Sequence, residues 1–205
     1  MQLAAITLEG QHVRLEPLKA HHVEPLLKAA RDPRIWEFTT VLIRDAADMQ
    51  KYVETALDWQ NAGTAVPFVT MEHGTHKIIG STRFANIERE HRRAEIGWTW
   101  LNPEYWRTPM NTEAKYLMLR HAFEQWKCVR VELKTHHKNA RSRAAIARLG
   151  AKEEGTLRHH MIQPDGSFRD SVYYSILDEE WPEVKEQLER MLARRPVTET
   201  GRTRA

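Results

Sequence analysis

The chain has 205 residues, of which 41% are hydrophobic and 29% are charged, a composition typical of one folded domain and not of a disordered chain. The formal net charge is +3, but residues 194–205 hold four arginines and one glutamate and account for the whole excess. The remaining chain is neutral, which argues against a nucleic-acid-binding surface. A lone cysteine, Cys128, excludes an internal disulfide and a multi-cysteine zinc site.

The chain start shows neither the basic residues nor the apolar stretch of a signal peptide, and no apolar run approaches the roughly 20 residues of a membrane span. We therefore expect a cytoplasmic protein. No repeat or linker interrupts residues 8–193, so we predict a single domain there, followed by a flexible basic tail over residues 194–205.

Hydrophobic periodicity predicts the elements of the first half. Alternating apolar and polar residues predict a strand at 12–18, and helical spacing predicts helices at 22–31 and 45–62. Three further segments, separated by turns, predict an antiparallel meander: 65–72, 77–87 and 93–101.

The second half alternates helix and strand. Thr112 is predicted to cap a helix that runs to about residue 127, and a β-branched strand follows at 129–135. Asn139 is predicted to cap a helix that ends at Leu149, with Gly150 directly after it. A hairpin and a final amphipathic helix complete the prediction of a mixed α/β domain: 153–163, 167–176 and 178–194.

Five sequence strings occur in a characteristic order: LEGQHVRLEPL at 8–18, AEIGW at 94–98, NTEA at 111–114, NARS at 139–142 and RDSVYYSI at 169–176. Together they resemble the GNAT superfamily of acetyl-CoA-dependent N-acetyltransferases, and within it the RimJ/RimL-like branch. The resemblance implies the acyl-CoA N-acyltransferase fold, an α/β (α+β) fold with a central mixed, mostly antiparallel sheet. This sheet would splay between its fourth and fifth strands and be flanked by helices.

The resemblance also implies where acetyl-CoA binds. The pantetheine arm would lie between the splayed strands at 93–101 and 129–135, and the pyrophosphate would meet the start of the next helix. The implied cofactor-binding residues are Trp98, Thr99, Trp100, Leu101, Arg107, Thr108, Met110, Asn111, Thr112, Asn139 and Ser142.

The phosphate loop departs from the family pattern. The Gln/Arg, Gly and Gly/Ala of that pattern fall on Trp106, Pro109 and Asn111. Because Pro109 lacks an N–H, the anion cradle is expected to lose one hydrogen bond or to change its shape. Arg107 could compensate by offering its guanidinium to phosphate.

For proton transfer the resemblance implies Glu95 as the base that deprotonates the amine, with His136 or His137 as alternatives. The other interpretation of Glu95 is an ion pair with an arginine such as Arg83. A second departure is Ile146, which stands where many members carry a tyrosine that protonates the departing thiolate.

Ser142 matches the serine to which the branch gives the role of that acid. Tyr173 and Tyr174 are alternative donors, of which strand alternation lets at most one point into the cleft, and Tyr174 is our candidate.

The resemblance places Trp36 and Phe38 in the loop that closes over the acceptor, and His136 faces the same gap. We expect acetyl transfer to a primary amine, either a protein N-terminus or a small molecule, by direct attack in a ternary complex. No metal is expected. A homodimer, a catalytically weak acyl-CoA-binding module and, as the weakest alternative, nucleic-acid binding through the basic tail stay open.

Overall fold

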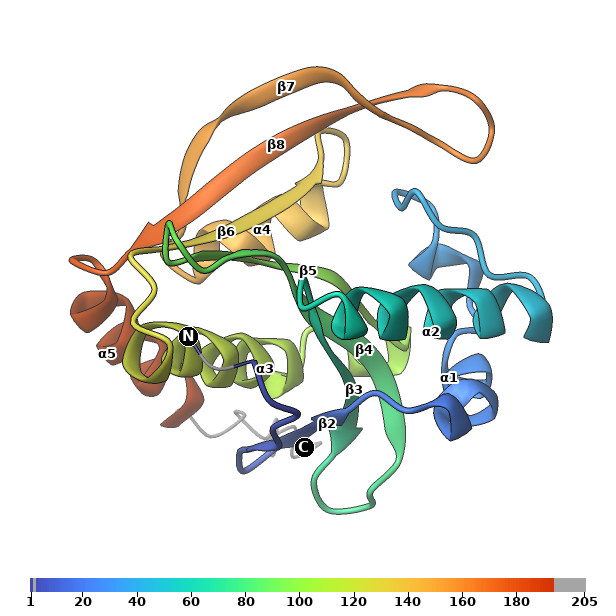
Figure 1. Cartoon of the computed structure of the whole chain (residues 1–205), viewed down its shortest axis with the longest axis horizontal. Helices are drawn as coiled ribbons and strands as arrows, with labels where there is room; N and C mark the ends of the chain where they lie inside the picture. Colours follow the sequence, from blue (N-terminus) through green and yellow to red (C-terminus); the bar gives the residue numbers. More distant parts are fainter. Residues whose placement is uncertain (2, 194–205) are drawn as a thin grey trace, which may run out of the picture.

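The structure is a computed structural model that describes residue 1 and residues 3–193; the predicted basic tail lies outside the described residues. The described chain forms one open sheet with the strand order β1-β2-β3-β4-β5-β6-β8-β7 (Figure 1). The strands are β1 Leu8–Glu9, β2 Val13–Pro17, β3 Val66–Glu72, β4 Ile78–Glu88, β5 Arg93–Leu101, β6 Arg130–His136, β7 Lys152–Ile162 and β8 Phe168–Leu177.

Neighbouring strands run antiparallel throughout this sheet except β5 and β6, which run parallel. The predicted mixed, mostly antiparallel sheet is therefore confirmed. The β7–β8 hairpin arches beyond the rest of the sheet at the top of Figure 1.

Helices cover both faces of the sheet: α1 Val23–Ala29, α2 Ala46–Asn61, α3 Pro109–Arg120, α4 Ala140–Arg148 and α5 Trp181–Ala193. α1 and α2 share one hydrophobic core that includes Val69 of β3, whereas α3 and α5 share another that includes the adjacent Phe68. Successive strand residues point to opposite faces, so one strand serves both cores.

The start of α3 corrects the sequence prediction. The helix begins at Pro109 with Thr108 as its N-cap, so Thr112 lies inside the helix and does not cap it. At its other end α3 continues into a π-helical turn, His121–Gln125. The predicted cap of α4 is confirmed, because the Asn139 side chain accepts a hydrogen bond from the Ser142 N–H at 3.0 Å.

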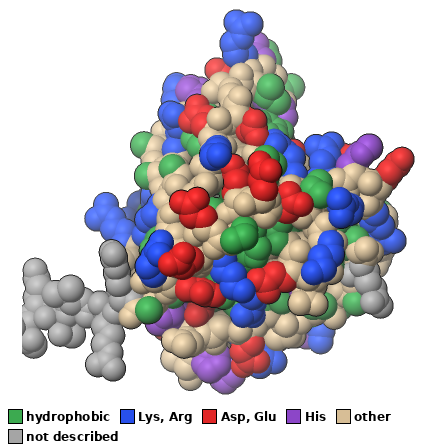
Figure 2. All heavy atoms as spheres, turned by 90° about the vertical axis from the view of Figure 1, so that its left-hand side faces the viewer, with side chains coloured by type: hydrophobic (Ala, Val, Ile, Leu, Met, Phe, Trp, Pro, Cys, Tyr) green, Lys and Arg blue, Asp and Glu red, His purple; other side chains and the backbone are tan. Residues whose placement is uncertain are grey.

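Acidic and basic side chains are interspersed over the face shown in Figure 2. This mixture agrees with the neutral charge of the chain outside its last residues. None of the described helices is both long and apolar enough to cross a membrane.

Candidate active site

A cavity of about 790 Å³ lies where β5 and β6 separate. The two strands pair over a short stretch, from Arg93 opposite Arg130 to Glu95 opposite Glu132, and then diverge. The predicted splay between these strands is confirmed, although the short β1 makes them the fifth and sixth strands of the chain. β5, β6, the starts of α3 and α4, the segment between α1 and α2, and the β7–β8 hairpin all contribute to its walls.

Trp98 bends β5 at the edge of this cavity. Its φ is 49°, in the left-handed region, and the register with β4 shifts between the pairs Ser81–Trp100 and Arg83–Gly97. An extra residue on one strand is a β-bulge, which bends the strand and breaks its pairing. Such local backbone strain is common at functional sites because it aims particular groups.

One half of the cavity is built from the first turns of α3 and α4. Thr108 and Asn111 line it from α3, and Asn139 and Ser142 line it from α4. At a helix start the first N–H groups lack intrahelical partners and the helix dipole is positive, which favours anions. Both helix starts thus present the positive ends of their dipoles to one cavity.

Three arginines add positive charge to this half: Arg107, Arg141 and Arg148. The guanidinium of Arg141 lies 3.4 Å from the centre of the Trp106 ring. Arg148 donates a hydrogen bond to Thr112 Oγ1 at 3.1 Å, which brings the end of α4 against α3. Arg107 directly precedes Thr108, the N-cap of α3, and has a φ of 62°.

Pro109 occupies the first position of α3, where an N–H would have no intrahelical partner. The helix therefore tolerates this proline without losing a hydrogen bond of its own. The N–H groups of Met110 and Asn111 still belong to the first turn, although the Met110 N–H lies 3.4 Å from Thr108 Oγ1. The helical part of the predicted anion site is therefore formed despite Pro109.

The other half of the cavity contains the carboxylate of Glu95, which is only 2% exposed. Its Oε2 accepts hydrogen bonds from Lys134 Nζ at 2.9 Å and from Asn86 Nδ2 at 2.8 Å. Among the described residues that line the cavity, no other carries a carboxylate. Glu95 is thus a buried base candidate held in a fixed position.

Arg83 is not the partner of Glu95, which corrects the alternative interpretation of that glutamate. Its guanidinium lies 4.9 to 5.3 Å from the ring centres of Tyr52, Trp59 and Trp98, and its Nε and Nη2 have no hydrogen-bond partner among the described residues. The aromatic rings of α2 and the bulge attract this cation away from Glu95.

The segment between α1 and α2 forms an outer wall of the cavity. The Trp36 ring packs 5.4 Å from Trp100, and its N–H donates to the Ala30 carbonyl at 3.0 Å. Phe38 lies 5.4 Å from His136, ring centre to ring centre. Both predicted acceptor residues of this segment, Trp36 and Phe38, therefore line the cavity.

Comparison with known proteins decides the family. The sequence profile of the family described as an acetyltransferase (GNAT) domain matches residues 12–152. The chain belongs to the GNAT acetyltransferase family. This GNAT chain is 38% identical to a provisionally assigned acetyltransferase from T. thermophilus, whose crystal structure aligns with a TM-score of 0.84 over 94% of this chain and 100% of that chain.

The name of a curated relative supports the predicted RimJ/RimL-like branch, and a further solved structure shares the fold. YdaF of Bacillus subtilis, provisionally named a ribosomal N-acetyltransferase, is 34% identical over 104 residues, which are 51% of this chain and 56% of YdaF. The match thus spans about half the length of that relative. RimJ of Mycobacterium smegmatis, solved in complex with CoA-disulfide, has the same fold with a TM-score of 0.80 at 21% identity, over 92% of this chain and 96% of RimJ.

Most of the site residues predicted for this GNAT domain line the one cavity: Trp36, Phe38, Glu95, Trp98, Thr99, Trp100, Leu101, Arg107, Thr108, Asn111, Asn139 and Ser142. Met110, Thr112, His136 and Tyr174 do not line it. Thr112 and His136 are buried beside it, and Met110 packs partly buried against the core under α3. Their predicted roles stay predictions.

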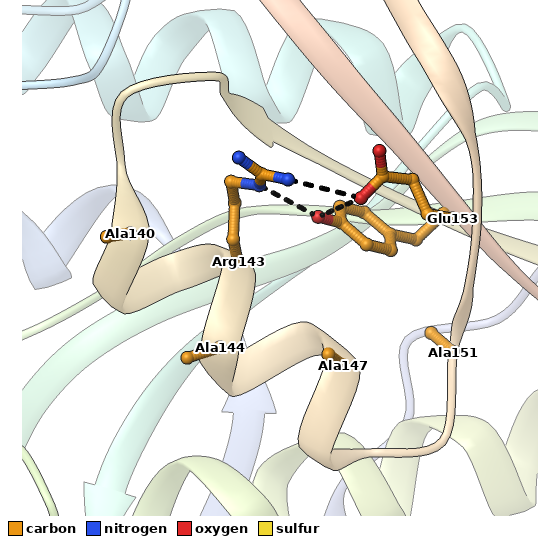
Figure 3. A pocket seen from close by; sticks show the side chains of 7 residues that line it. Ala140, Arg143, Ala144, Ala147, Ala151 and Glu153 are labelled. Atoms are coloured by element: carbon orange, nitrogen blue, oxygen red, sulfur yellow. Dashed lines mark hydrogen bonds and ion pairs between the residues drawn. The ribbon is translucent and has the colours of Figure 1, made fainter.

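Tyr174 belongs to a different pocket of the GNAT domain. Figure 3 shows Arg143 of α4 and Glu153 of β7 reaching toward each other across it. The Tyr174 hydroxyl donates to Glu153 at 3.1 Å, and Arg143 Nε donates to that hydroxyl at 3.2 Å. The other strand tyrosine, Tyr173, lies on the opposite face with its hydroxyl 3.3 Å from His160 Nε2.

His136 contacts Phe38 and the turn that precedes α4. Its Nδ1 accepts a hydrogen bond from the Lys138 N–H at 3.0 Å, and burial, followed by the charge of His137, lowers its pKa. The imidazole is therefore held neutral over a wider pH range than in water. Its ring contact with Phe38 connects β6 to the segment between α1 and α2.

Sequence reasoning missed five cations that line the cavity of this GNAT domain: Lys115, Lys134, Arg141, Arg148 and Arg169. Lys115 is buried, its Nζ donates to the hydroxyls of Thr82 and Thr99, and burial lowers its pKa to about 7. A lysine among the apolar residues of α3 was the available signal. Lys134 and Arg169 gave none, because they become neighbours of Glu95 only through the sheet.

Proposed function

We propose that this protein is an N-acetyltransferase that transfers an acetyl group from acetyl-CoA to a primary amine by direct attack in a ternary complex. The observation that carries the proposal is the divided cavity. One half offers two helix starts and three arginines, and the other half offers one fixed carboxylate. The gap between β5 and β6 joins the two halves.

The cationic half supports binding of acetyl-CoA. The N–H groups at the start of α3 and the guanidinium groups of Arg107, Arg141 and Arg148 are suited to phosphate oxygens. Beyond Glu95 the β6-facing edge of β5, at Trp98 to Leu101, has no strand partner in the described chain. This edge can hydrogen-bond to the amide groups of a pantetheine arm. The same fold holds CoA-disulfide in RimJ.

The carboxylate half supports activation of the acceptor. An amine is mostly protonated at neutral pH, so a base must take its proton before the nitrogen has a free lone pair. Glu95 is such a base, directly or through a water molecule. The amine nitrogen then forms a bond to the acetyl carbon, the carbon–sulfur bond breaks, and the thiolate of CoA leaves with the electron pair.

Two further groups complete the reaction in this proposal. Backbone N–H groups of the bulged strand near Trp98 and Trp100 stabilise the negative charge that develops on the acetyl oxygen. Ser142, which lines the cavity at the start of α4, donates a proton to the departing thiolate. Ile146 also lines the cavity and has no proton to donate.

A melting experiment tests the donor. Acetyl-CoA at about 100 times its dissociation constant is expected to stabilise the protein by about 2.7 kcal/mol, read as a rise in melting temperature. Arg107→Gln should weaken this binding on the order of 10-fold, because a charged hydrogen bond is lost. Arg89→Gln, at an exposed turn, is the matched control. No melting shift at millimolar acetyl-CoA would reject the donor.

An assay of thiol release with a panel of amines tests the transfer. The buried Cys128, whose thiol pKa burial raises to about 11, should contribute little background to a thiol reagent. Release that requires an amine supports the transferase. A melting shift without release from any amine would instead support an acyl-CoA-binding module. A cytoplasmic location stays a prediction from composition.

A further inference from the structure

The carboxylate half of the cavity, which contains Glu95, holds more positive charge than the Glu95 carboxylate can neutralise. Lys134 forms an ion pair with Glu95, and Arg169 lines the same half from the start of β8. Arg169 is only 8% exposed. No carboxylate lies within ion-pair distance of its guanidinium anywhere in residues 1 and 3–193. Arg83 adds another buried cation behind Trp98.

Arg169 is held in place by polar contacts that leave its charge unpaired. Its Nε donates to Ser171 Oγ at 3.1 Å, and that hydroxyl oxygen also lies 3.0 Å from His160 Nδ1. In the sheet Arg169 pairs with Met161 of β7, which lines the cavity too. The guanidinium is therefore fixed at the wall instead of extending into solvent.

An unpaired buried guanidinium costs several kcal/mol of desolvation, because an arginine does not become neutral in a protein. Burial lowers the pKa of Arg169, and the nearby charge of Glu95 opposes that effect. A ligand of opposite charge would offset this cost at Arg169, which faces the cavity, whereas Arg83 is covered by aromatic rings. Arginine is suited to a carboxylate, since both are planar and form two parallel hydrogen bonds.

We propose that Arg169 binds a carboxylate of the acceptor, so that the substrate class is an amine that also carries a carboxylate group. The inference rests on the proposed acetyltransferase function. Glu95 receives the proton of the amine while Arg169 holds the anion. Lys134 stays bonded to Glu95, with its Nζ 5.6 Å from the centre of the Tyr173 ring. The carboxylate is either the α-carboxylate of a free amino acid or the acidic side chain of a peptide N-terminus.

Matched acceptors separate these two sources. Glycine against glycinamide tests an α-carboxylate, and a tripeptide amide that begins with glutamate against one that begins with glutamine tests an acidic side chain. Rates are compared at equal concentrations of neutral amine, because an amide lowers the pKa of the neighbouring amine. We expect the carboxylate member of at least one pair to have a kcat/KM on the order of 10-fold higher. Equal values within both pairs would overturn the proposal.

Variants locate the effect at Arg169. Arg169→Gln should raise KM for the preferred carboxylate acceptor on the order of 10- to 100-fold, with little change in kcat, and should leave its amide partner unaffected. Arg169→Lys should recover part of the loss. Arg158→Gln, an exposed arginine of β7, is the control. A loss of equal size for both members of the pair would show a merely structural role and overturn the assignment.

The failure of this inference differs from failure of the proposed function. If glycinamide and the glutamine peptide release thiol as fast as glycine and the glutamate peptide, the carboxylate site is rejected. The proposed transferase activity is then still supported. Thiol release from none of the four acceptors, beside a normal melting shift with acetyl-CoA, rejects transfer to such amines and the carboxylate site with it. Should Arg169→Gln not fold, the matched pairs on the unmodified protein still decide.

Discussion

Glu95 combines two interactions that a single substitution can separate. Its carboxylate forms a buried ion pair with Lys134, and in the proposed reaction it also accepts the proton of the amine. A glutamine at this position keeps an oxygen that can accept from Lys134 and Asn86 and loses the basic carboxylate. Loss of the ion pair should therefore lower stability, whereas loss of the proton acceptor should lower kcat.

We expect Glu95→Gln to lower kcat on the order of 10²- to 10⁴-fold, because general-base catalysis is removed. The loss should shrink from about pH 6 to about pH 9, since the amine then loses its proton without help. Steady-state kinetics across this range checks the expectation, with the acetyl-CoA melting shift unchanged.

Glu132→Gln is the control for this change. Glu132 is also a strand carboxylate bound to two arginines, at 2.8 Å to Arg130 and 3.2 Å to Arg93, and it does not line the cavity. Its replacement should affect stability alone. Wild-type rates for Glu95→Gln at every pH would transfer the role of base to His136, His137 or a chain of water molecules.

Lys115 predicts a pH dependence of stability. In the folded protein its pKa is lowered to about 7, whereas in the unfolded chain it returns to 10.5. Between these values the unfolded state binds one more proton, so the free energy of unfolding should rise with pH by up to about 1.4 kcal/mol per pH unit. Lys115→Met should lack this increase.

Urea unfolding of both proteins at a series of pH values between about 7 and 9 measures the difference. Lys51→Met, at an exposed position of α2, should follow the wild type throughout. Parallel curves for the wild type and Lys115→Met would show that Lys115 stays charged in the fold and hydrogen-bonds to Thr82 and Thr99 as an ammonium.

At the scale of elements, periodicity predicted nearly every strand and helix, because each element buries one face. The start of α3 was predicted wrongly. Thr112 has the side chain of a cap, but Thr108 followed by proline is the stronger start, since proline fits the first helical position. The bulge at Trp98 was not predicted because a left-handed tryptophan has no local sequence signal.

The cap of α4 predicts a separable effect on stability and turnover. Asn139→Ala removes the hydrogen bond from the Ser142 N–H and should cost about 1 kcal/mol of stability. Because Asn139 also lines the cavity, we expect turnover to fall more than acetyl-CoA affinity. Urea unfolding and kinetics on the same preparation provide the two values.

Asp45→Ala is a matched control, since Asp45 caps α2 by accepting from the Asp48 N–H at 2.9 Å. It should cost a similar amount of stability without changing turnover. If Asn139→Ala behaves in the same way as Asp45→Ala, the asparagine serves the helix alone.

At the scale of the whole molecule, the site depends on contacts between distant parts of the chain. The sequence predicted that strands 93–101 and 129–135 border the site, yet it could not place Arg169 there. That residue comes to the half of the cavity that contains Glu95 because β8 lies beside β6, with Ser171 opposite His136. The ion pair of Glu95 was predicted with the wrong partner for the same reason: Lys134 comes from β6, beside β5.

Glu113 joins the beginning of the chain to the helix that starts at the site. Although it belongs to the NTEA string, its side chain turns away from the cavity and is 4% exposed. Its carboxylate accepts hydrogen bonds from the backbone N–H groups of Gln11, His12 and Val13 at 2.8, 2.6 and 2.7 Å. These bonds hold the β1–β2 turn against α3.

Glu113→Gln should therefore lower the free energy of unfolding. The amide has one accepting oxygen, and its N–H groups face backbone N–H groups that also donate, so we expect a loss on the order of 3 kcal/mol in the free energy of unfolding.

Gly10→Ala should act on the same contact, because its Cβ would lie 2.4 Å from Glu113 Cδ. The two losses should not add, since both disrupt one contact. Urea unfolding of the single and double variants measures this coupling, with Glu189→Gln as an exposed control expected within about 0.5 kcal/mol of wild type. Full additivity would show that Gly10 matters for the conformation of its own turn and not for the bond to α3.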